Sequence, residues 1–291
     1  MIIKYIQMQN TGLKRSGGDK YYTKPAVVEM CLLHISEVIG IANDHFIIEP
    51  SAGNGAFIPG IKKLCGNTAF YDIKPDVIEP DDIKLVDAEP DIIQQDYLTL
   101  DVSSMAKYKT HVIGNPPFGR QSSLAIKFIK KSAEFCDTIS FILPKSFKKD
   151  SLKKHFPLEF HLVFEKDMPR NSFMVGEKEH DVPCVFQIWE KRTDKRELLE
   201  KLYPSQYIFV KKTEEPHISF RRVGVNAGVI DTEYMSKSEQ SHYFIRFKEG
   251  TILTKKLYNE ICDIKFTNSE YTVGPKSISK QELIKEFNKI L

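Results

Sequence analysis

The stretch that decides the fold is FIIEPSAGNGAF, residues 46–57. Its first three residues form a short apolar run that is typical of a buried strand, and a segment with helical spacing follows as far as Leu64. Because glycine tolerates backbone angles that other residues avoid, Gly53 and Gly55 let the chain turn sharply and approach a ligand closely. The pattern predicts a strand, a glycine-rich turn and a helix.

The chemistry of this turn excludes two common phosphate-binding loops. A dinucleotide fingerprint needs three glycines in a different spacing, and a phosphate loop needs Gly-Lys-Ser or Gly-Lys-Thr. Glu49, at the tip of the strand, is unfavourable for phosphate but suited to a cationic ligand that carries an α-amino group. The N–H groups at the start of the following helix add further donors. The turn therefore indicates a ligand with a positively charged end.

A second informative stretch is Asn115-Pro116-Pro117-Phe118, which follows the apolar run 111–114. Two consecutive prolines fix φ and remove two backbone donors, so the Asn115 amide and the Pro116 carbonyl can be held rigidly as acceptors. Two acceptors on the hydrogens of a ring-conjugated amino group push electron density onto its nitrogen as a methyl group arrives. Phe118 would stack on the ring. The alternative interpretation is a proline-rich turn that ends a strand.

With these two stretches in this order, the sequence resembles the amino-group methyltransferases that use S-adenosylmethionine, and among them the N6-adenine DNA enzymes. The resemblance covers about the first two thirds of the chain. It implies S-adenosylmethionine as the cofactor, S-adenosylhomocysteine as the product, and no metal. It also implies that the cofactor is bound by Glu49, Ser51, Gly53 and Gly55 in the first stretch.

The segment Tyr22-Thr23 precedes a predicted helix that begins at Pro25. It is similar to a family segment that closes over the methionine end of the cofactor, although Lys24 is inserted here. Without that role, Thr23 is only the residue that caps the helix. Because this segment comes first and any recognition region comes last, the order matches one subgroup of the adenine methyltransferases, the gamma type.

Two further strand ends carry acidic residues. Asp72 follows Glu49 at close to the spacing of about 20 residues at which a doubly wound fold places a ribose-binding carboxylate. Ile73 would then pack on the adenine of the cofactor. By resemblance, Asp96 accepts a hydrogen bond from the amino group of the cofactor, and Tyr97 borders its ring.

The resemblance also implies how the nucleic acid is held. An adenine extruded from the duplex needs both faces covered, and Phe118 and Phe173, the latter on a predicted loop before the last strand, are placed to cover them. Basic residues are candidates for contacts with phosphates or base edges, although exposed charges are common on any surface. These candidates are Arg120, Lys148, Lys149, Arg221 and Arg222.

Composition bounds the remaining possibilities. A chain of 291 residues with 41% hydrophobic residues can hold one α/β domain and a smaller appendage. The net charge of +3 permits nucleic-acid binding without requiring it. The five cysteines are far apart and never form Cys-x-x-Cys, which disfavours a disulfide framework or a zinc site and fits a reducing compartment. No apolar run approaches membrane-spanning length, so we expect a cytoplasmic protein.

The sequence therefore predicts a doubly wound, Rossmann-like α/β methyltransferase domain over residues 1–192 and a smaller α+β appendage over 193–291, which could recognise the target. The segments 14–20 and 74–91 are expected to be polar surface loops. The predicted function is N6-methylation of an adenine flipped out of duplex DNA. The alternatives are methylation of adenine in RNA, methylation of a protein glutamine, and a non-catalytic nucleic-acid-binding role. The sequence does not specify the recognition site, the oligomeric state or whether a restriction enzyme is associated.

Overall fold

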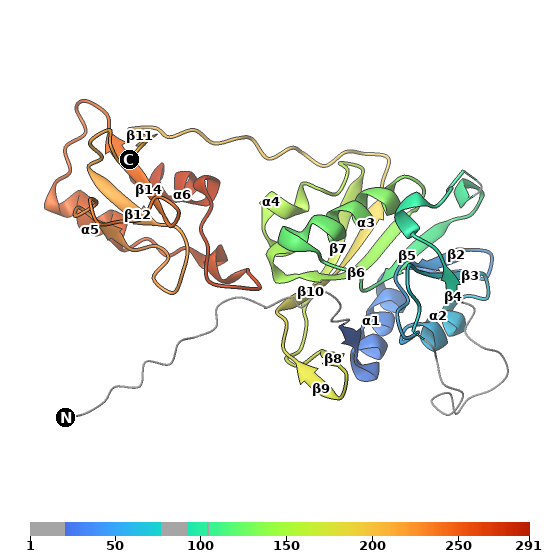
Figure 1. Cartoon of the computed structure of the whole chain (residues 1–291). Helices are drawn as coiled ribbons and strands as arrows, with labels where there is room; N and C mark the ends of the chain where they lie inside the picture. Colours follow the sequence, from blue (N-terminus) through green and yellow to red (C-terminus); the bar gives the residue numbers. More distant parts are fainter. Residues whose placement is uncertain (1–20, 77–91, 104) are drawn as a thin grey trace, which may run out of the picture. The chain divides into compact units, whose positions relative to one another are not determined.

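Seven strands form the central sheet of the computed structural model, which describes residues 21–76, 92–103 and 105–291 (Figure 1). Their order across the sheet is β4-β3-β2-β5-β6-β10-β7. The strands are β2 (Phe46–Glu49), β3 (Thr68–Asp72), β4 (Ile92–Gln94), β5 (Thr110–Gly114), β6 (Thr138–Pro144), β7 (Phe160–Asp167) and β10 (Cys184–Lys191). Strands β2 to β6 pair in parallel, whereas β10 runs antiparallel to both β6 and β7.

Apolar sequence explains the centre of this sheet. Every residue of β5 and β6 is buried, as expected for parallel strands that are covered on both faces. Helix α3 (Ser123–Ala133) buries Phe128 and Ile129 in the same core cluster as Ile139 and Phe141 of β6. Helices α1 (Pro25–Val38) and α2 (Ile58–Leu64) lie on the opposite face of the sheet (Figure 1). The predicted doubly wound α/β architecture is confirmed.

Helix α1 begins where the sequence predicts, with a proline in its first turn. Its buried residues recur at helical spacing and are Val27, Val28, Cys31, Leu32 and Ile35. The residue before the helix is Lys24, and no side chain caps the first turn. The interpretation of Thr23 as the capping residue is therefore wrong, and its hydroxyl is engaged elsewhere.

A second, three-stranded sheet of this unit has the order β1-β8-β9. Strand β1 (Tyr22–Thr23) pairs antiparallel with β8 (Phe173–Val175), which pairs in turn with β9 (Lys178–His180). Strands β7 and β10 pair antiparallel, but the expected loop around Phe173 between them is a β-hairpin. Strand β8 is only three residues long and finds its partner about 150 positions away in sequence, which is why local pattern did not reveal it.

The described chain divides into two units between Leu198 and Leu199, a few residues beyond the boundary expected from composition. Residues 193–198 stay with the first unit because Arg196 is anchored there. Its guanidinium donates to the carbonyl of Phe156 at 3.0 Å and lies over the ring of Trp189.

The second unit is an α+β structure with its own core. Its antiparallel sheet has the order β11-β14-β12-β13 and packs with two helices through a cluster that includes Tyr207, Phe220 and Phe287. A capping box begins the last helix: Ser279 accepts from the N–H of Glu282, and Glu282 accepts from that of Ser279. The elements are β11 (Tyr207–Val210), β12 (Ile218–Arg221), β13 (Ile230–Asp231), β14 (His242–Phe247), α5 (Lys255–Cys262) and α6 (Lys280–Phe287).

Two sequence predictions fall largely outside the described residues. They are the polar arm 14–20 and most of the acidic segment 74–91. Within the described ranges, none of the helices has the length and apolar character needed to cross a membrane.

Candidate functional site

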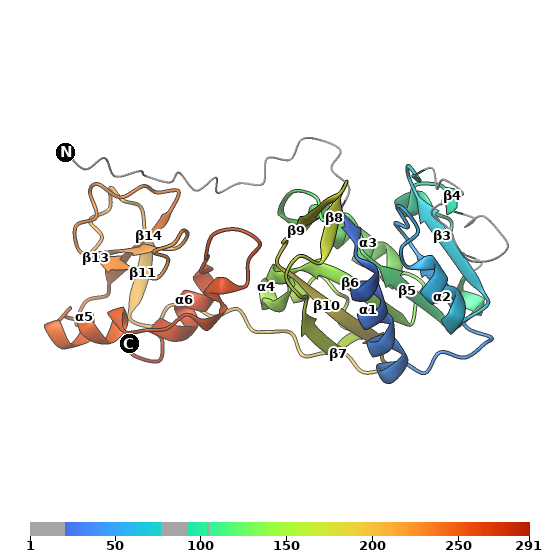
Figure 2. The ribbon, with the colours of Figure 1, turned by 90° about the horizontal axis from the view of Figure 1, so that it is seen from below.

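The candidate site lies at the edge of the sheet where four neighbouring parallel strands end. Strands β4, β3, β2 and β5 end beside Asp96, Asp72, Glu49 and Asn115, respectively. Chain order reverses between β2 and β5, because β3 and β4 lie on one side of β2 while β5 and β6 lie on the other. Open α/β sheets bind ligands at such a switch point, outside the carboxyl ends of the strands. Because β2 and β5 are paired neighbours, the fold brings both sequence motifs to one place. In Figure 2, helices α1 and α2 lie in front of the sheet.

Glu49 is a buried acid at this switch point, only 2% exposed. Its Oε2 atom is buried and has no hydrogen-bond partner among the described residues. Burial, together with the charge of Asp72, raises the pKa of the Glu49 carboxyl to about 8. A Cβ at Gly114 would stand 3.4 Å from Glu49 Cγ, so a glycine here lets the acid pack directly on β5. An isolated buried carboxyl is costly, which is the arrangement expected where a cation completes the site.

The glycine-rich turn is tied to Asp72. One carboxylate oxygen accepts from the N–H of Gly53 at 2.8 Å, and the other accepts from the N–H of Lys74 at 2.8 Å. A carboxylate offers about four acceptor positions, so capacity remains for two hydroxyl donors. Ile73, next in the chain, is 68% exposed. Gly53 and Gly55 both have positive φ, 57° and 78°, so the turn needs glycine at these positions.

Tyr22 covers the turn from the side of β1. Its hydroxyl donates to the Asp76 carboxylate, and its ring would lie 3.4 Å from a Cβ at Gly53. Burial and the Asp76 hydrogen bond raise the pKa of the Tyr22 phenol well above its usual range. The structure therefore places Tyr22, Gly53 and Asp72 close together, and their contacts with a cofactor stay a prediction.

Asp96 and Tyr97 differ in their surroundings. Asp96 is half-buried and accepts from the N–H of Leu98 at 2.9 Å, which caps a short helical turn. The ring of Tyr97 is only 2% exposed; it stacks on Phe128, and its hydroxyl pairs with that of Ser132 at 2.8 Å. Tyr97 is thus a core residue here, and a contact between its ring and a ligand stays a prediction.

Asn115 is the most constrained polar side chain of the site. Its Nδ2 donates to the carbonyl of Tyr21 at 3.3 Å and to the hydroxyl of Thr23 at 3.2 Å. The Oδ1 atom is buried, and within the described part of the chain it has no hydrogen-bond partner. The backbone carbonyl of Asn115 accepts from the Ser51 hydroxyl at 3.1 Å. This hydrogen bond joins the tetrad, residues 115–118, to the glycine-rich turn.

The loop after Asn115 is held in one shape. Pro116 is buried, whereas Phe118 is half-buried and its carbonyl accepts from the N–H groups of Leu124 and Ala125 at the start of α3. Gly119 has a φ of 67°, and a Cβ there would come within 2.8–3.0 Å of Leu124. The backbone after Phe118 therefore adopts a conformation that requires glycine at position 119.

Phe173 does not present a free ring. It is 1% exposed, lies on β8 opposite Thr23, and meets the ring of Tyr21 edge-on. The expectation that it lies on a loop is wrong. Its role as the second face of a base clamp is untested and requires the ring to become uncovered.

Two of the predicted basic residues, Lys148 and Lys149, follow β6 at the same edge of the sheet as the site. Lys148 donates to Asp167 at 2.7 Å, and Lys145 lies 3.2 Å from the same carboxylate. Lys149 is only 9% exposed. Arg120 is exposed at the start of the loop before α3. A phosphate role for Lys148 and Lys149 stays a prediction, and at Lys148 the anion would compete with Asp167.

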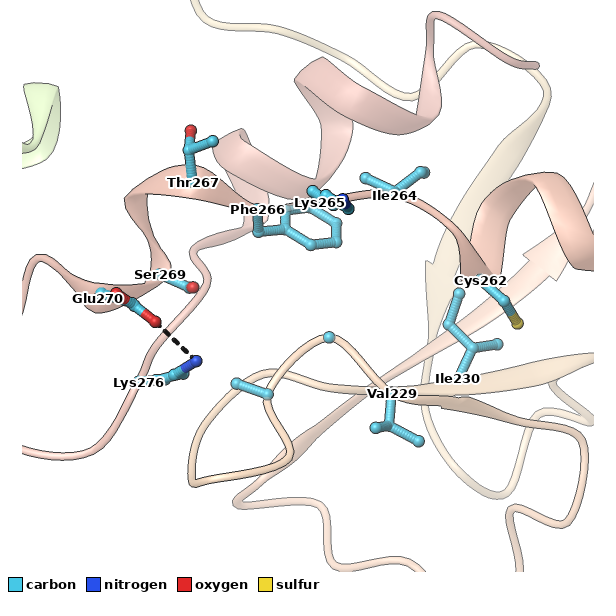
Figure 3. Close-up of a pocket in the computed structure, with 12 residues that line it drawn as sticks. Val229, Ile230, Cys262, Ile264, Lys265, Phe266, Thr267, Ser269, Glu270 and Lys276 are labelled. Carbon is cyan, nitrogen blue, oxygen red and sulfur yellow. Dashed lines mark ion pairs between the residues drawn. The ribbon is translucent and has the colours of Figure 1, made fainter.

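Arg221 and Arg222 lie in the second unit, and both bind its backbone. Arg221 Nε donates to the carbonyl of Val223 at 3.2 Å, and Arg222 donates to that of Gln240 at 2.7 Å. This unit also contains a pocket of about 680 Å³. The pocket lies between the turn 227–230 and the segment 262–270, with an ion pair between Lys276 and Glu270 at its side (Figure 3). None of the predicted site residues lines it.

Sequence reasoning missed Tyr21, which reaches Asn115 through its backbone carbonyl. A main-chain contact carries no residue-type signal. The antiparallel pairing of β1 with β8 brings this carbonyl into place, and that pairing joins segments far apart in the chain.

Comparison with known proteins gives likenesses of fold. No family model matches the chain, and no curated protein matches it. Among solved structures, it is similar to a protein from Thermoplasma acidophilum (21% identity, 59% of this chain and 89% of that one, TM-score 0.38). It is also similar to the 23S rRNA methyltransferase ErmE (15% identity, 62% of this chain and 72% of that one, TM-score 0.41). A further similar structure is an rRNA methylase from Streptococcus thermophilus (15% identity, 58% of this chain and 98% of that one, TM-score 0.39).

Proposed function

We propose that this chain is an S-adenosylmethionine-dependent methyltransferase that methylates N6 of an adenine flipped out of DNA. The observation that carries the proposal is the Asn115 side chain. Its two amide hydrogens are directed at Tyr21 and Thr23, while its buried oxygen has no partner among the residues that the structure describes. A buried acceptor without a partner costs about 1–3 kcal/mol, so the site is complementary to a ligand that donates an N–H.

The tetrad selects an amino group attached to a flat ring. The acceptors are Asn115 Oδ1 and the carbonyl of Pro116, which the prolines hold without flexible torsions. Phe118 is half-buried beside them and offers an aromatic surface for one face of the ring. Adenine combines an exocyclic NH₂ with a stacking surface, and it becomes accessible once extruded from the helix.

The residues of the glycine-rich turn fit S-adenosylmethionine. Glu49, with its unpartnered Oε2, suits the ammonium group, and Asp72 has acceptor capacity left for two ribose hydroxyls. Ile73 exposes an apolar side chain where the adenine of the cofactor would pack. Asp96 lies at the end of the neighbouring strand, where it would accept from the amino group of that adenine.

When bound, the cofactor supplies an electrophilic methyl group on its sulfonium. The contribution of the chain is to position and polarise the nucleophile. Asn115 and the Pro116 carbonyl accept the hydrogens of N6, which raises electron density on the nitrogen and stabilises the positive charge that develops there. Ser51 ties Asn115 to the cofactor turn, so the two reactants are held by one connected frame.

The test is transfer of labelled methyl to duplex DNA, single-stranded DNA, RNA and protein, with nucleoside analysis of the product. N6-methyladenine in DNA is the expected result. Label in the adenine of RNA would support methylation of N6 but show that the substrate is RNA and not DNA. Label in protein, or no label despite measurable binding of S-adenosylmethionine, would refute the proposal.

The matched variant is Asn115→Ala. Removing the acceptor should lower kcat by about 100-fold or more. The Kd for S-adenosylmethionine should change by less than about twofold, because the cofactor contacts lie on other strands. Ordinary turnover by this variant would contradict the assigned role of Asn115.

A further inference from the structure

Strand β1 is fastened to the hairpin formed by β8 and β9. Tyr22 and Thr23 pair with Met174 and Phe173, respectively. One residue after the strand, the N–H of Lys24 donates to the carbonyl of Ser172 at 3.1 Å. The Lys24 ammonium forms an ion pair with Glu179. The strand is therefore fixed on one side by backbone pairing and a charge pair.

The other side of this strand faces Asn115. Tyr21 contributes its carbonyl and Thr23, two positions on, contributes its hydroxyl, in keeping with the two-residue repeat of extended chain. Thr23 is 5% exposed, so its hydroxyl is shielded from water. Because an amide NH₂ has two hydrogens, these two acceptors use both side-chain donors of Asn115.

We infer that β1 is a positioning strand that fixes the orientation of the Asn115 amide. The carbonyl of Tyr21 can only accept, so a flipped amide would set Oδ1 against another carbonyl oxygen. The flip is therefore disfavoured, and Oδ1 is the atom presented to the substrate. This inference rests on the proposed function and adds a specificity element to it: the site accepts an amino group and rejects a carbonyl group at the same position.

The residues that fix the orientation of the Asn115 amide lie outside the tetrad. Thr23 and Tyr21 lie about 90 positions before Asn115 and are held by a hairpin about 60 positions after it. Thr23 is thus a positioning residue that acts through Asn115. The competing role, implied by resemblance, is a contact between Thr23 and the methionine end of the cofactor.

The experiment compares Thr23→Val with Thr23→Ser. Valine keeps the shape and removes the acceptor, so kcat at saturating cofactor should fall about tenfold while the Kd for S-adenosylmethionine changes by less than about twofold. Serine keeps the hydroxyl and should restore kcat to within about threefold of wild type. A rise in the cofactor Kd with kcat unchanged would overturn the inference in favour of the cofactor contact.

Thr138→Val is the matched control for the loss of a buried threonine hydroxyl. Thr138 is 1% exposed, begins β6 at the opposite edge of the sheet, and pairs with His111. This variant should lower stability without lowering kcat. Equal losses of kcat in the two valine variants would show a general packing effect and would also overturn the inference.

A measurement without turnover separates this inference from the proposed function. In ¹⁵N-labelled protein, the side-chain NH₂ signals of Asn115 are those that disappear in Asn115→Ala. They should exchange slowly with solvent in the wild type and at least about tenfold faster in Thr23→Val. If these signals exchange slowly in a wild-type protein that methylates none of the substrates, the proposed function is refuted and the positioning role of β1 stands. Equally fast exchange in the wild type and in Thr23→Val would refute the positioning role of β1.

Discussion

At the residue scale, the site is defined by two buried oxygens without partners in the described structure, Glu49 Oε2 and Asn115 Oδ1. Each lies at the carboxyl end of a central parallel strand. One is an acid, suited to a cation, and the other belongs to an amide whose hydrogens are already engaged. Their different chemistry supports the proposal that they bind different ligands.

Glu49 should couple cofactor binding to proton release. Its pKa is raised to about 8 by burial and by Asp72, so in the cofactor-free protein at pH 7 the carboxyl holds its proton. A bound ammonium group favours the carboxylate, so the Kd for S-adenosylmethionine should fall as pH rises toward about 8. Above that pH the Kd should rise again, because an α-amino group loses its own proton there. The Kd can change by at most about tenfold per pH unit, because one proton is involved.

Titration calorimetry at pH 7 in buffers of different ionisation enthalpy measures this proton. The Glu49→Gln variant is the control, because it cannot ionise at this position. Proton release that is the same in both proteins would rule out Glu49 as its source.

His111 should make the fold sensitive to acid. It is fully buried, pairs with His45 and Thr138, and has a pKa lowered from 6.5 to about 4 by burial and by His45 and Lys109. The unfolded chain therefore binds a proton at a higher pH than the folded one. Stability is intact above pH 6.5 and is lost as pH falls toward 4, by about 2 kcal/mol between pH 7 and pH 5.

Chemical denaturation at these two pH values measures the loss. Because other groups also titrate, the quantity to compare is the difference between wild type and His111→Asn. An identical pH dependence of the unfolding free energy in both proteins would contradict the assignment.

At the element scale, the loop that carries the tetrad should not tolerate a side chain at Gly119. Its φ is 67°, and a Cβ would come within 2.9 Å of the backbone nitrogen of Leu124. Gly119→Ala should lower the unfolding free energy by about 1–3 kcal/mol and reduce kcat as the loop shifts. Thermal unfolding and turnover measure the two effects. Gly66→Ala is the control, since nothing lies within 4 Å of that position; equal effects in both variants would refute the argument.

Elements with strong local signals were predictable. The stripe of α1, the strand and turn at 46–57, and the capping box of α6 each depend on residues close together in sequence. The small sheet β1-β8-β9 was not, because two- and three-residue strands carry little pattern. That sheet explains why Phe173 is buried and why Thr23 contacts Asn115.

At the scale of the whole molecule, the second unit remains a proposed target-recognition element. If Arg221 contacts phosphate, Arg221→Gln should weaken DNA binding and reduce the slope of log K against log salt by about one. Because its guanidinium also binds the carbonyl of Val223, thermal unfolding must be followed alongside. Arg192→Gln, an exposed arginine paired with Glu190, is the control. An unchanged salt slope in Arg221→Gln would exclude the contact.

The sequence by itself determined the doubly wound architecture, the glycine turn with its positive φ angles, and the identity of the polar groups at the strand ends. These follow from local apolar periodicity and from backbone angles that few residues adopt. Only the tertiary structure decided which way the Asn115 amide faces, that Phe173 and Tyr97 are buried, and that Lys148 is paired with Asp167. The physical reason is that hydrogen-bond partners and burial depend on segments that meet only once the sheet has formed.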